Sequence, residues 1–507
     1  KFTPERLLAS TQKLFSADVI RLLVSSPTPI PDADNRALAA LNASVAANTS
    51  ARLSEKTLGF AALPKLGAPG ELVAEELLSR WDVTRLELSN GVRALLYPNK
   101  AESGQIRILV RFGRGYQAVN PDQGGLLWAG PLVLPENGIG NIKRTEIDQM
   151  VNGRRIELNF SVDDDAFQFG ANTRPDDLAD QLILIATKLE HPGWDPAPVE
   201  RAKALATSGY ASFEMSAMSV LQRDLEYLLR NKDARWKSAT PAEVAQFDAA
   251  KFAAYWQPLM AQGPVEVLLF GDFEKAEAIK ALEKSFGAMT SRAPSPVSAL
   301  ARNVRFPAPT AAPLRLTHRG ARDQAAAVMA WPTGGGISGI TEGRQLETLA
   351  AIFRDRLFEK FRAEQAASYS PDMAANWPLN FNSGGYLMAY AQVNPADVDR
   401  FFAFADEVAA DLVANPVSAD ELQRAVEPTK QAIERAASGN SFWLNQLKGA
   451  SYDPQRFEAL GKLYSDFNDV TPAILQSLAQ SYFIKEKAWK LVVEPQSGNG
   501  AATTVAR

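Results

Sequence analysis

Residues 85–97, which read RLELSNGVRALLY, decide the fold class of this chain. The two arms, 85–88 and 92–97, are rich in β-forming apolar residues, and the Ser-Asn-Gly triplet between them favours the tight turn of a hairpin. Residues 106–112 (IRILVRF) alternate apolar and polar side chains and predict a third strand. This part of the chain therefore predicts the beginning of a β-sheet.

Helical patterns follow these strands. Apolar residues recur at helical spacing in four stretches, at 122–134, 143–151, 175–190 and 196–231. Further strands are predicted at 156–162, 166–171 and 265–273, and a helix at 274–286. Strands grouped with long helices on one face indicate the α+β class.

The rest of the chain repeats this plan with lower fidelity. The expected strands are at 314–318, 325–331, 385–393 and 489–494, and the expected helices at 345–361, 395–415 and 418–438. We interpret residues 80–495 as two diverged copies of one α+β unit, each a mixed sheet with helices. The predicted domains are 80–300 and 301–507.

The first 79 residues look different. Residues 1–31 carry a helical pattern as far as Phe15 and a strand-like run at 20–24, which together cannot form a core. We interpret them as the trailing helix and strand of a preceding domain, so that the chain is the carboxy-terminal part of a longer polypeptide. Residues 32–79, with an Ala-rich helical stretch at 34–48 and two Pro and two Gly within 61–70, are expected to form a linker.

Composition excludes several classes of protein. A chain of 507 residues is long enough for two to four domains. The absence of cysteine excludes disulfides, thiolate metal sites and a cysteine nucleophile. A net charge of -4 gives no basic field for nucleic acid, and no apolar run approaches the roughly 18 residues of a membrane span.

The stretch 362–369, RAEQAASY, resembles a signature of the insulinase/pitrilysin zinc peptidases, Arg-x-Glu-Gln-x-x-x-Tyr. Three further stretches are similar to the family in the same order: LSNGV at 88–92, LEHPGWD at 189–195 and LLFGDF at 268–273. The resemblance implies a clamshell of four homologous α+β domains with zinc in the first. This chain then resembles the carboxy-terminal, non-metal half of a large member of the bacterial periplasmic kind.

The same resemblance implies roles for Arg362 and Tyr369. In the family this pair lies in the half without the metal and binds the substrate across a cavity. A guanidinium and a phenol aimed at one carbonyl oxygen suit a tetrahedral intermediate, because both donate hydrogen bonds. The alternative is an amphipathic helix that ends in a solvated Arg362, with Tyr369 at the boundary of the core.

The family's His-x-x-Glu-His zinc motif is degenerate here. Trp128, Pro131 and Leu132 stand where the resemblance places the two histidines and the glutamate, and the further carboxylate ligand would fall near Ser208. We therefore expect this chain to bind no metal, and zinc to lie in the missing half.

The two histidines and an acidic run complete the candidate functional groups. His191 and His318 are the only histidines, and neither belongs to a ligand pair. We expect His191, which precedes a proline at a predicted helix end, to be a cap or packing residue. The acidic run 163–165 lies between two predicted strands and is expected to be a solvated turn.

Two functions follow from these observations. The chain is expected to be part of a zinc endopeptidase that cleaves peptides or unfolded segments in a closed chamber, with the metal-bearing half or subunit and a peptide substrate as partners. This half alone is expected to be inactive, and the resemblance points to the bacterial periplasm. The alternative is a catalytically inactive assembly subunit, like the core proteins of the mitochondrial respiratory complex. The pair Arg362 and Tyr369 discriminates between them, because a scaffold does not need it.

Overall fold

The computed structural model describes residues 3–16, 21–26, 28–47, 58–295, 297–363 and 371–496. The chain divides into two compact units, 1–57 and 58–507. The first contains two helices, α1 (Pro4–Leu14) and α2 (Ala33–Ala47), as expected. The Thr3 side chain caps α1 by accepting a hydrogen bond from the Arg6 N–H.

The prediction of a strand at 20–24 was wrong for residues 21–24, the part of it that the structure describes. Residues 21–24 are irregular, and no described segment of the first unit pairs with them. A β-rich run becomes a strand only when another strand supplies its hydrogen bonds.

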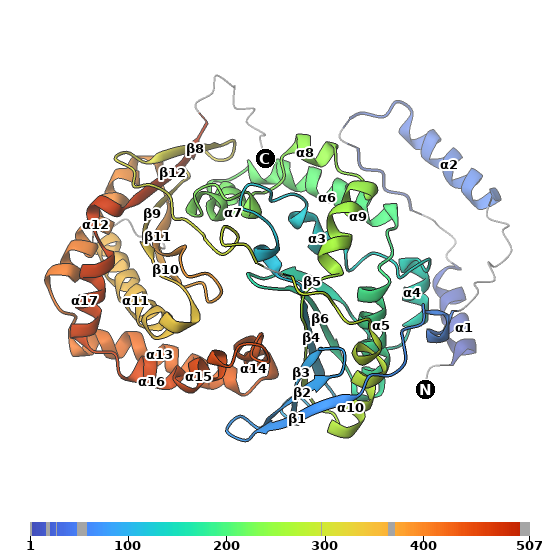
Figure 1. Cartoon of the computed structure of the whole chain (residues 1–507). Coiled ribbons are helices and arrows are strands. Elements are labelled where there is room, and N and C mark those ends of the chain that lie inside the picture. The colour runs from blue at the N-terminus through green and yellow to red at the C-terminus, as the bar shows by residue number, and fades with distance from the viewer. Residues whose placement is uncertain are drawn as a thin grey trace. The chain divides into compact units, whose positions relative to one another are not determined.

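The second unit contains two sheets (Figure 1). The first sheet has the order β1-β2-β3-β7-β4-β6-β5. Strands β3 and β7 run parallel and all other neighbours antiparallel. Its strands are β1 (Leu72–Leu78), β2 (Val83–Leu88), β3 (Arg93–Pro98), β4 (Ile106–Phe112), β5 (Asn159–Val162), β6 (Phe167–Thr173) and β7 (Val265–Gly271). The predicted hairpin is therefore β2 and β3, whereas β1 lies within 32–79, so this part of the expected linker belongs to the sheet.

Helices of the first copy connect these strands. They are α3 (Gly130–Val133), α4 (Arg144–Met150), α5 (Leu178–Glu190), α6 (Pro196–Phe213), α7 (Ala217–Leu229), α8 (Pro241–Ala245), α9 (Ala249–Met260) and α10 (Lys275–Lys284), with short 3₁₀ turns η1 (Phe60–Ala62), η2 (Gly115–Ala118), η3 (Leu127–Ala129), η4 (Pro175–Asp177), η5 (Ala234–Trp236) and η6 (Phe286–Ala288). The helix expected at 196–231 is divided into α6 and α7, because Ser216 caps α7 through the Ser219 N–H.

The helix expected at 122–134 is reduced to η3 and α3. Gly125 has a φ of 57°, a left-handed conformation that helical residues do not adopt. A Cβ on the preceding Gly124 would lie 1.7 Å from the carbonyl oxygen of Ala234, so this turn packs backbone against backbone. The helical period in the sequence is real, but tertiary packing prevents the helix from beginning before Leu127.

The second copy forms a five-stranded sheet of order β10-β11-β9-β12-β8. Its strands are β8 (Leu314–His318), β9 (Ala325–Thr333), β10 (Asp372–Asn376), β11 (Gly385–Val393) and β12 (Trp489–Pro495). Its helices are α11 (Ile340–Ala363), α12 (Val398–Ala414), α13 (Ala419–Ala437), α14 (Asn440–Leu447), α15 (Gln455–Gly461), α16 (Leu463–Asn468) and α17 (Pro472–Tyr482), with 3₁₀ turns η7 (Ile337–Gly339), η8 (Pro395–Asp397) and η9 (Lys485–Lys487). Among the described helices, none combines the length and apolar content that a membrane crossing requires.

Strand order confirms the predicted repeat. The five strands β3-β7-β4-β6-β5 match β8-β12-β9-β11-β10 position by position, in the same chain order. The single parallel pair of each five-strand set, β3 with β7 and β8 with β12, is also equivalent. The chain therefore has two copies of one mixed-sheet unit, and the first copy adds the strands β1 and β2.

Each copy supplies helices to the other. One face of each sheet packs on helices of its own copy. On its other face, the first sheet packs against the apolar side chains of 426–467, whereas the second sheet packs against α7 of the first copy. Because both faces are covered, the central strands β7 and β9 are buried almost throughout, which explains their nearly continuous apolar sequences.

Candidate functional site

Helix α11 positions Arg362, the first predicted site residue. An apolar side of this helix, which includes Leu349 and Phe353, is buried in the core of the second copy. Arg362 lies in the last turn, where a cation interacts favourably with the helix dipole. Its side chain is 71% exposed, and its guanidinium lies 3.7 Å from the Glu359 carboxylate. Such a long, exposed ion pair contributes little, so the guanidinium can exchange Glu359 for another partner at small cost.

Tyr369, the second predicted site residue, belongs to 364–370 and lies outside the described residues. The described chain resumes before β10, the edge strand of the second sheet. The seven-residue separation of Arg362 and Tyr369 thus spans the connection from a helix end to a sheet edge. Their pairing remains a prediction.

A cavity of about 770 Å³ lies along the carboxy-terminal half of α11. Residues of α11, α12 and α13 line it, and Ala363, the neighbour of Arg362, is one of them. Ile352 and Val408 give it an apolar wall, and the ring of Phe358, which is 43% exposed, also lines it. Its volume lies within the range of ligand sites, roughly 300–1,000 Å³, and seven of its eleven lining residues are charged.

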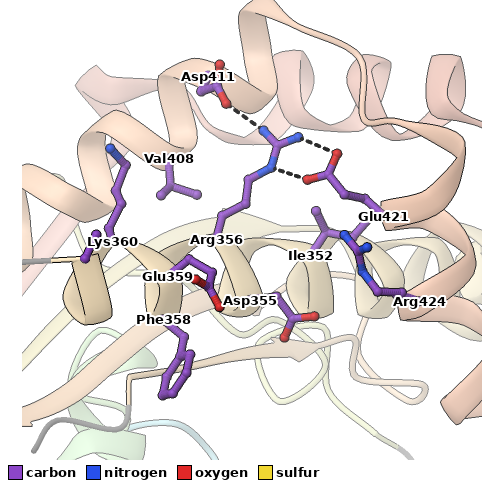
Figure 2. Close-up of a pocket in the computed structure, with 11 residues that line it drawn as sticks. Ile352, Asp355, Arg356, Phe358, Glu359, Lys360, Val408, Asp411, Glu421 and Arg424 are labelled. Atoms are coloured by element: carbon purple, nitrogen blue, oxygen red, sulfur yellow. Dashed lines mark hydrogen bonds and ion pairs between the residues drawn. The ribbon is translucent and has the colours of Figure 1, made fainter. Parts of the chain in front are cut away.

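Arg356 organises one wall of this cavity (Figure 2). Its guanidinium donates to both oxygens of Glu421, at 2.9 and 3.2 Å, and to Asp411 Oδ2 at 2.7 Å. Hydrogen bonds from Arg356 lower the pKa of Glu421 to about 2, against the opposing effect of burial. Glu421 also caps α13 together with Ser418. Because acidic side chains hold the Arg356 guanidinium on both sides, it forms a fixed part of the cavity wall and is not available to donate to a ligand.

The degenerate motif of the first copy offers no metal ligand. Trp128 packs against Phe247, with 5.1 Å between ring centroids, and Pro131 and Leu132 face solvent. Indole, proline and leucine side chains have no atom that binds zinc. Ser208 is exposed on α6. No group of three or more His, Asp or Glu side chains suited to a metal is present in the described part of the chain.

Both histidines have structural partners. His191 is the C-cap residue of α5, and its Nε2 lies 3.3 Å from the carbonyl oxygen of Lys65. His318 is buried at the end of β8. Its Nδ1 accepts from the Gly320 N–H at 3.1 Å, which leaves Nε2 as the donor to Gln324 O at 2.7 Å. Both ring nitrogens of His318 are therefore occupied.

The acidic run 163–165 is not the solvated turn that the sequence predicted. Asp163 pairs with Lys448 of the second copy at 2.7 Å, and Asp165 pairs with Arg111 at 2.6 Å. Burial, together with the charge of Asp163, raises the pKa of Asp164 to about 6. The run lies at the junction of the two copies, which is where its counter-charges come from.

The same junction contains a buried charge cluster that the sequence analysis missed. Glu266 of β7 accepts from Arg111 of β4 at 2.9 Å, from the Gly449 N–H at 2.7 Å and from the Ser451 N–H at 2.9 Å. A signal was present, because Glu266 is the charged residue of the otherwise apolar β7, and Arg111 is one of two arginines in β4, whose other residues are all apolar. A charge in a strand that is buried on both faces requires a partner.

Comparison with protein families and curated proteins gives consistent matches. Residues 246–428 match the family model described as Peptidase M16 inactive domain. The chain is 24% identical over 200 residues to the chloroplastic stromal processing peptidase of Pisum sativum, which covers 38% of this chain and 16% of the relative. It is 25% identical over 120 residues to the probable zinc protease PqqL of Haemophilus influenzae, covering 24% of this chain and 13% of the relative. The chain thus spans only a small part of the curated relatives that it matches.

Solved structures share the fold over most of the chain. The periplasmic protease PqqL from Escherichia coli superposes with a TM-score of 0.71 at 15% identity, covering 93% of this chain and 51% of that chain. A peptidase M16 inactive domain from Pseudomonas fluorescens gives 0.68 at 14% identity, covering 83% and 100%. A chain of Complex III2 from Candida albicans gives 0.60 at 14% identity, covering 81% and 95%.

Proposed function

The chain belongs to the M16 peptidases, the insulinase family of zinc proteases, and we propose that it is the non-metal half of a zinc-dependent endopeptidase. It corresponds to about half of the PqqL structure, which supports a metal-bearing amino-terminal half as its partner, in the same polypeptide or as a separate subunit. That half would hold the zinc, because Trp128, Pro131 and Leu132 leave the equivalent segment of this chain without ligands.

We propose that Arg362 and Tyr369 bind the substrate carbonyl group. The observation that carries this proposal is the exposed guanidinium of Arg362 at the end of α11, beside a cavity of about 770 Å³. When the carbonyl carbon is attacked, negative charge develops on its oxygen. A guanidinium and a phenol that donate to this oxygen stabilise the charge more than they stabilise the neutral substrate. The metal supplies the activated water in the partner half.

The proposed substrates are peptides or unfolded segments. A chamber that closes between two halves admits a thin chain and excludes a folded protein. An extended substrate could add to a sheet edge in the partner half through main-chain hydrogen bonds, which demand little sequence specificity. We place the enzyme in the bacterial periplasm, the compartment given for the PqqL protease of Escherichia coli.

Reconstitution tests this function. The purified chain should contain no stoichiometric zinc by elemental analysis and should not cleave quenched fluorescent peptides. Mixing with the metal-bearing half should produce hydrolysis that a chelator abolishes. As a control, a metal-bearing half without its zinc ligands should give none. Chelator-sensitive cleavage by the chain alone, or no cleavage by the intact pair, contradicts the proposal.

A structural role is the second candidate, favoured by the likeness to a Complex III2 chain. A scaffold requires folding and partner contacts but not the donors of Arg362 and Tyr369. If replacement of both residues leaves assembly and every measured function of the complex unchanged, the scaffold role is the better account.

A further inference from the structure

A second cavity lies near the beginning of β7, beside the turn between β2 and β3. Its volume is about 370 Å³, within the range of small-molecule sites. The rest of the wall comes from Arg114, from 289–294, the segment that follows η6, and from Tyr452 of the second copy. The described residues that line this cavity include two arginines, Arg114 and Arg292, and no acidic side chain. An anion is therefore the first ligand class to consider.

Arg292 is the most informative group in this cavity. Its Nη1 atom is buried and has no hydrogen-bond partner among the described residues. Its guanidinium carbon lies 6.0 Å from the centre of the Phe112 ring. Burial lowers the pKa of Arg292 to about 10, although nearby Glu190 opposes this shift. A buried N–H without an acceptor is costly, so the surrounding protein leaves part of the hydrogen-bonding capacity of this guanidinium unused.

Arg114 supplies a second cationic donor. Its Nε donates to the carbonyl oxygen of Ser295 at 2.9 Å, and its Nη groups have no partner in the described part of the chain. Neutral groups in the wall are already used, because Asn90 Nδ2 donates to Phe286 O at 2.8 Å and Ser291 Oγ to Asn90 O at 3.3 Å. The two guanidiniums are therefore the donors that remain for a ligand.

The acidic groups around this cavity lie outside its lining. Glu190 accepts from the backbone N–H of Thr290 at 3.3 Å and from its hydroxyl, and it attracts Arg292. The adjacent, smaller cavity, which Arg114 also lines, contains Asp165, Glu266 and Asp453 together with Arg111 and Arg456. The acidic groups near Arg114 therefore belong to that cavity, and the two arginines are the charged groups of this one.

We propose that this cavity binds an oxyanion between Arg114 and Arg292, carried either by a phosphate group or by a carboxylate such as a peptide carboxy terminus. Guanidinium groups present planar pairs of donors that match the oxygen atoms of both anions. Val92, Val265 and Met289 provide apolar wall for the remainder of a small organic anion. The proposal is independent of the peptidase activity.

Isothermal titration of the full chain tests this site. The probes are inorganic phosphate, an acetylated tripeptide acid and the same tripeptide as its amide, at constant ionic strength with chloride. We expect saturable binding of phosphate, of the tripeptide acid, or of both, and none of the amide. Arg292→Met should weaken binding by about tenfold or more. Arg302→Met, which removes an exposed arginine outside the cavity, should leave the Kd unchanged.

The two anions identify the source of the ligand. Binding of phosphate alone indicates a phosphate ligand, and binding of the tripeptide acid alone indicates a carboxylate. If Arg292→Met fails to fold by circular dichroism, Arg292→Lys keeps the charge, loses the paired donors and should still weaken binding. The absence of saturable binding to the wild-type chain overturns the proposal, as does an unchanged Kd in a folded Arg292 variant.

Discussion

The two copies share one strand order but differ in the segment that follows their equivalent strands β4 and β9. In the first copy this segment is divided into η3, α3 and α4, whereas in the second it is the continuous 24-residue helix α11. The first segment contains Trp128, Pro131 and Leu132, the positions that resemble a degenerate metal motif, and the second ends at Ala363, next to Arg362. Sheet pairing and burial on both faces maintain the strands, so divergence is concentrated in the helix that presents functional side chains.

Local packing explains this difference. In the first copy, Gly124 and Gly125 form a tight turn against the backbone of Ala234, so the helical region begins only at Leu127 and is short. In the second copy, an uninterrupted apolar side holds α11 on its sheet and leaves the last turn exposed. The first copy has only a short helical segment here, whereas the second has a long helix whose last turn is exposed.

The largest expected effect is at the junction of the copies. Glu266→Ala removes the acceptor of Arg111, Gly449 and Ser451 and leaves the buried Arg111 with less counter-charge. The free energy of unfolding should fall by roughly 3–5 kcal/mol. Denaturant unfolding measures this loss, with Glu76→Ala in an exposed ion pair as the control at under about 1 kcal/mol. Equal losses in the two variants would mean that the cluster does not join the copies.

The next effect is a pH dependence of the free energy of unfolding, which we expect from Lys188, a buried lysine of the first copy. Lys188 Nζ donates to the carbonyl oxygen of Asn137, and burial lowers its pKa to about 7, with Arg144 lowering it further and Glu136 opposing. Between pH 7 and about 10, the unfolded chain binds a proton that the folded chain does not. Wild-type stability should therefore rise with pH in this window, relative to Lys188→Met.

Denaturant midpoints at several pH values measure that difference, which should be on the order of a few kcal/mol over the window. Lys100→Met removes an exposed lysine and should leave the wild-type slope unchanged. A Lys188→Met variant with the wild-type slope would show that Lys188 keeps an ordinary pKa.

A glycine substitution probes the turn before the short helical segment of the first copy at smaller scale. Gly124→Ala should lower the free energy of unfolding by roughly 1–3 kcal/mol, because its Cβ overlaps the Ala234 carbonyl. Thermal unfolding that leaves Gly124→Ala unchanged would show that this turn is not closely packed.

Gly209→Ala gives the smallest expected effect, with the opposite sign. Gly209 lies within α6, and a Cβ there meets no atom within 4 Å. Alanine has the higher helix propensity, so this variant should gain up to about 1 kcal/mol in the same thermal assay. A loss of stability would mean that the surface of α6 around Gly209 is packed after all.

The sequence predicts the strands that are buried on both faces, together with the edge strands β5 and β8, and misses the edge strands β1 and β10. Strands β4, β7 and β9 were predicted because burial requires apolar side chains along them. The edge strands β1 and β10, LVAEELL and DMAAN, lack a strong β pattern and become strands through their partners β2 and β11. The residues of an edge strand do not by themselves indicate which strand it pairs with.

The candidate site also has some features that the sequence predicts and others that depend on tertiary packing. The exposed helix end with Arg362 follows from the periodicity of 345–361, and the missing metal ligands follow from residue identity alone. The ion pair of Arg356 with Glu421 joins residues 65 positions apart and depends on how α11 and α13 pack. No motif in one sequence predicts that contact. By contrast, the pairing of Arg111 with Glu266 could have been predicted from the sequence, because both are charged residues within apolar strands.

The central proposal is that Arg362, at the end of α11, and Tyr369 donate to the substrate carbonyl. Tyr369→Phe in the assembled enzyme tests it most directly, because the change removes one hydroxyl and keeps the ring. We predict a kcat lower by about two to three orders of magnitude, with zinc content and folding unchanged. Tyr464→Phe, at an exposed tyrosine of α16, and Arg354→Ala, at an exposed ion pair of α11, are the matched controls for Tyr369→Phe and for Arg362→Ala. Wild-type kcat and kcat/KM in Tyr369→Phe would contradict the claim for this tyrosine.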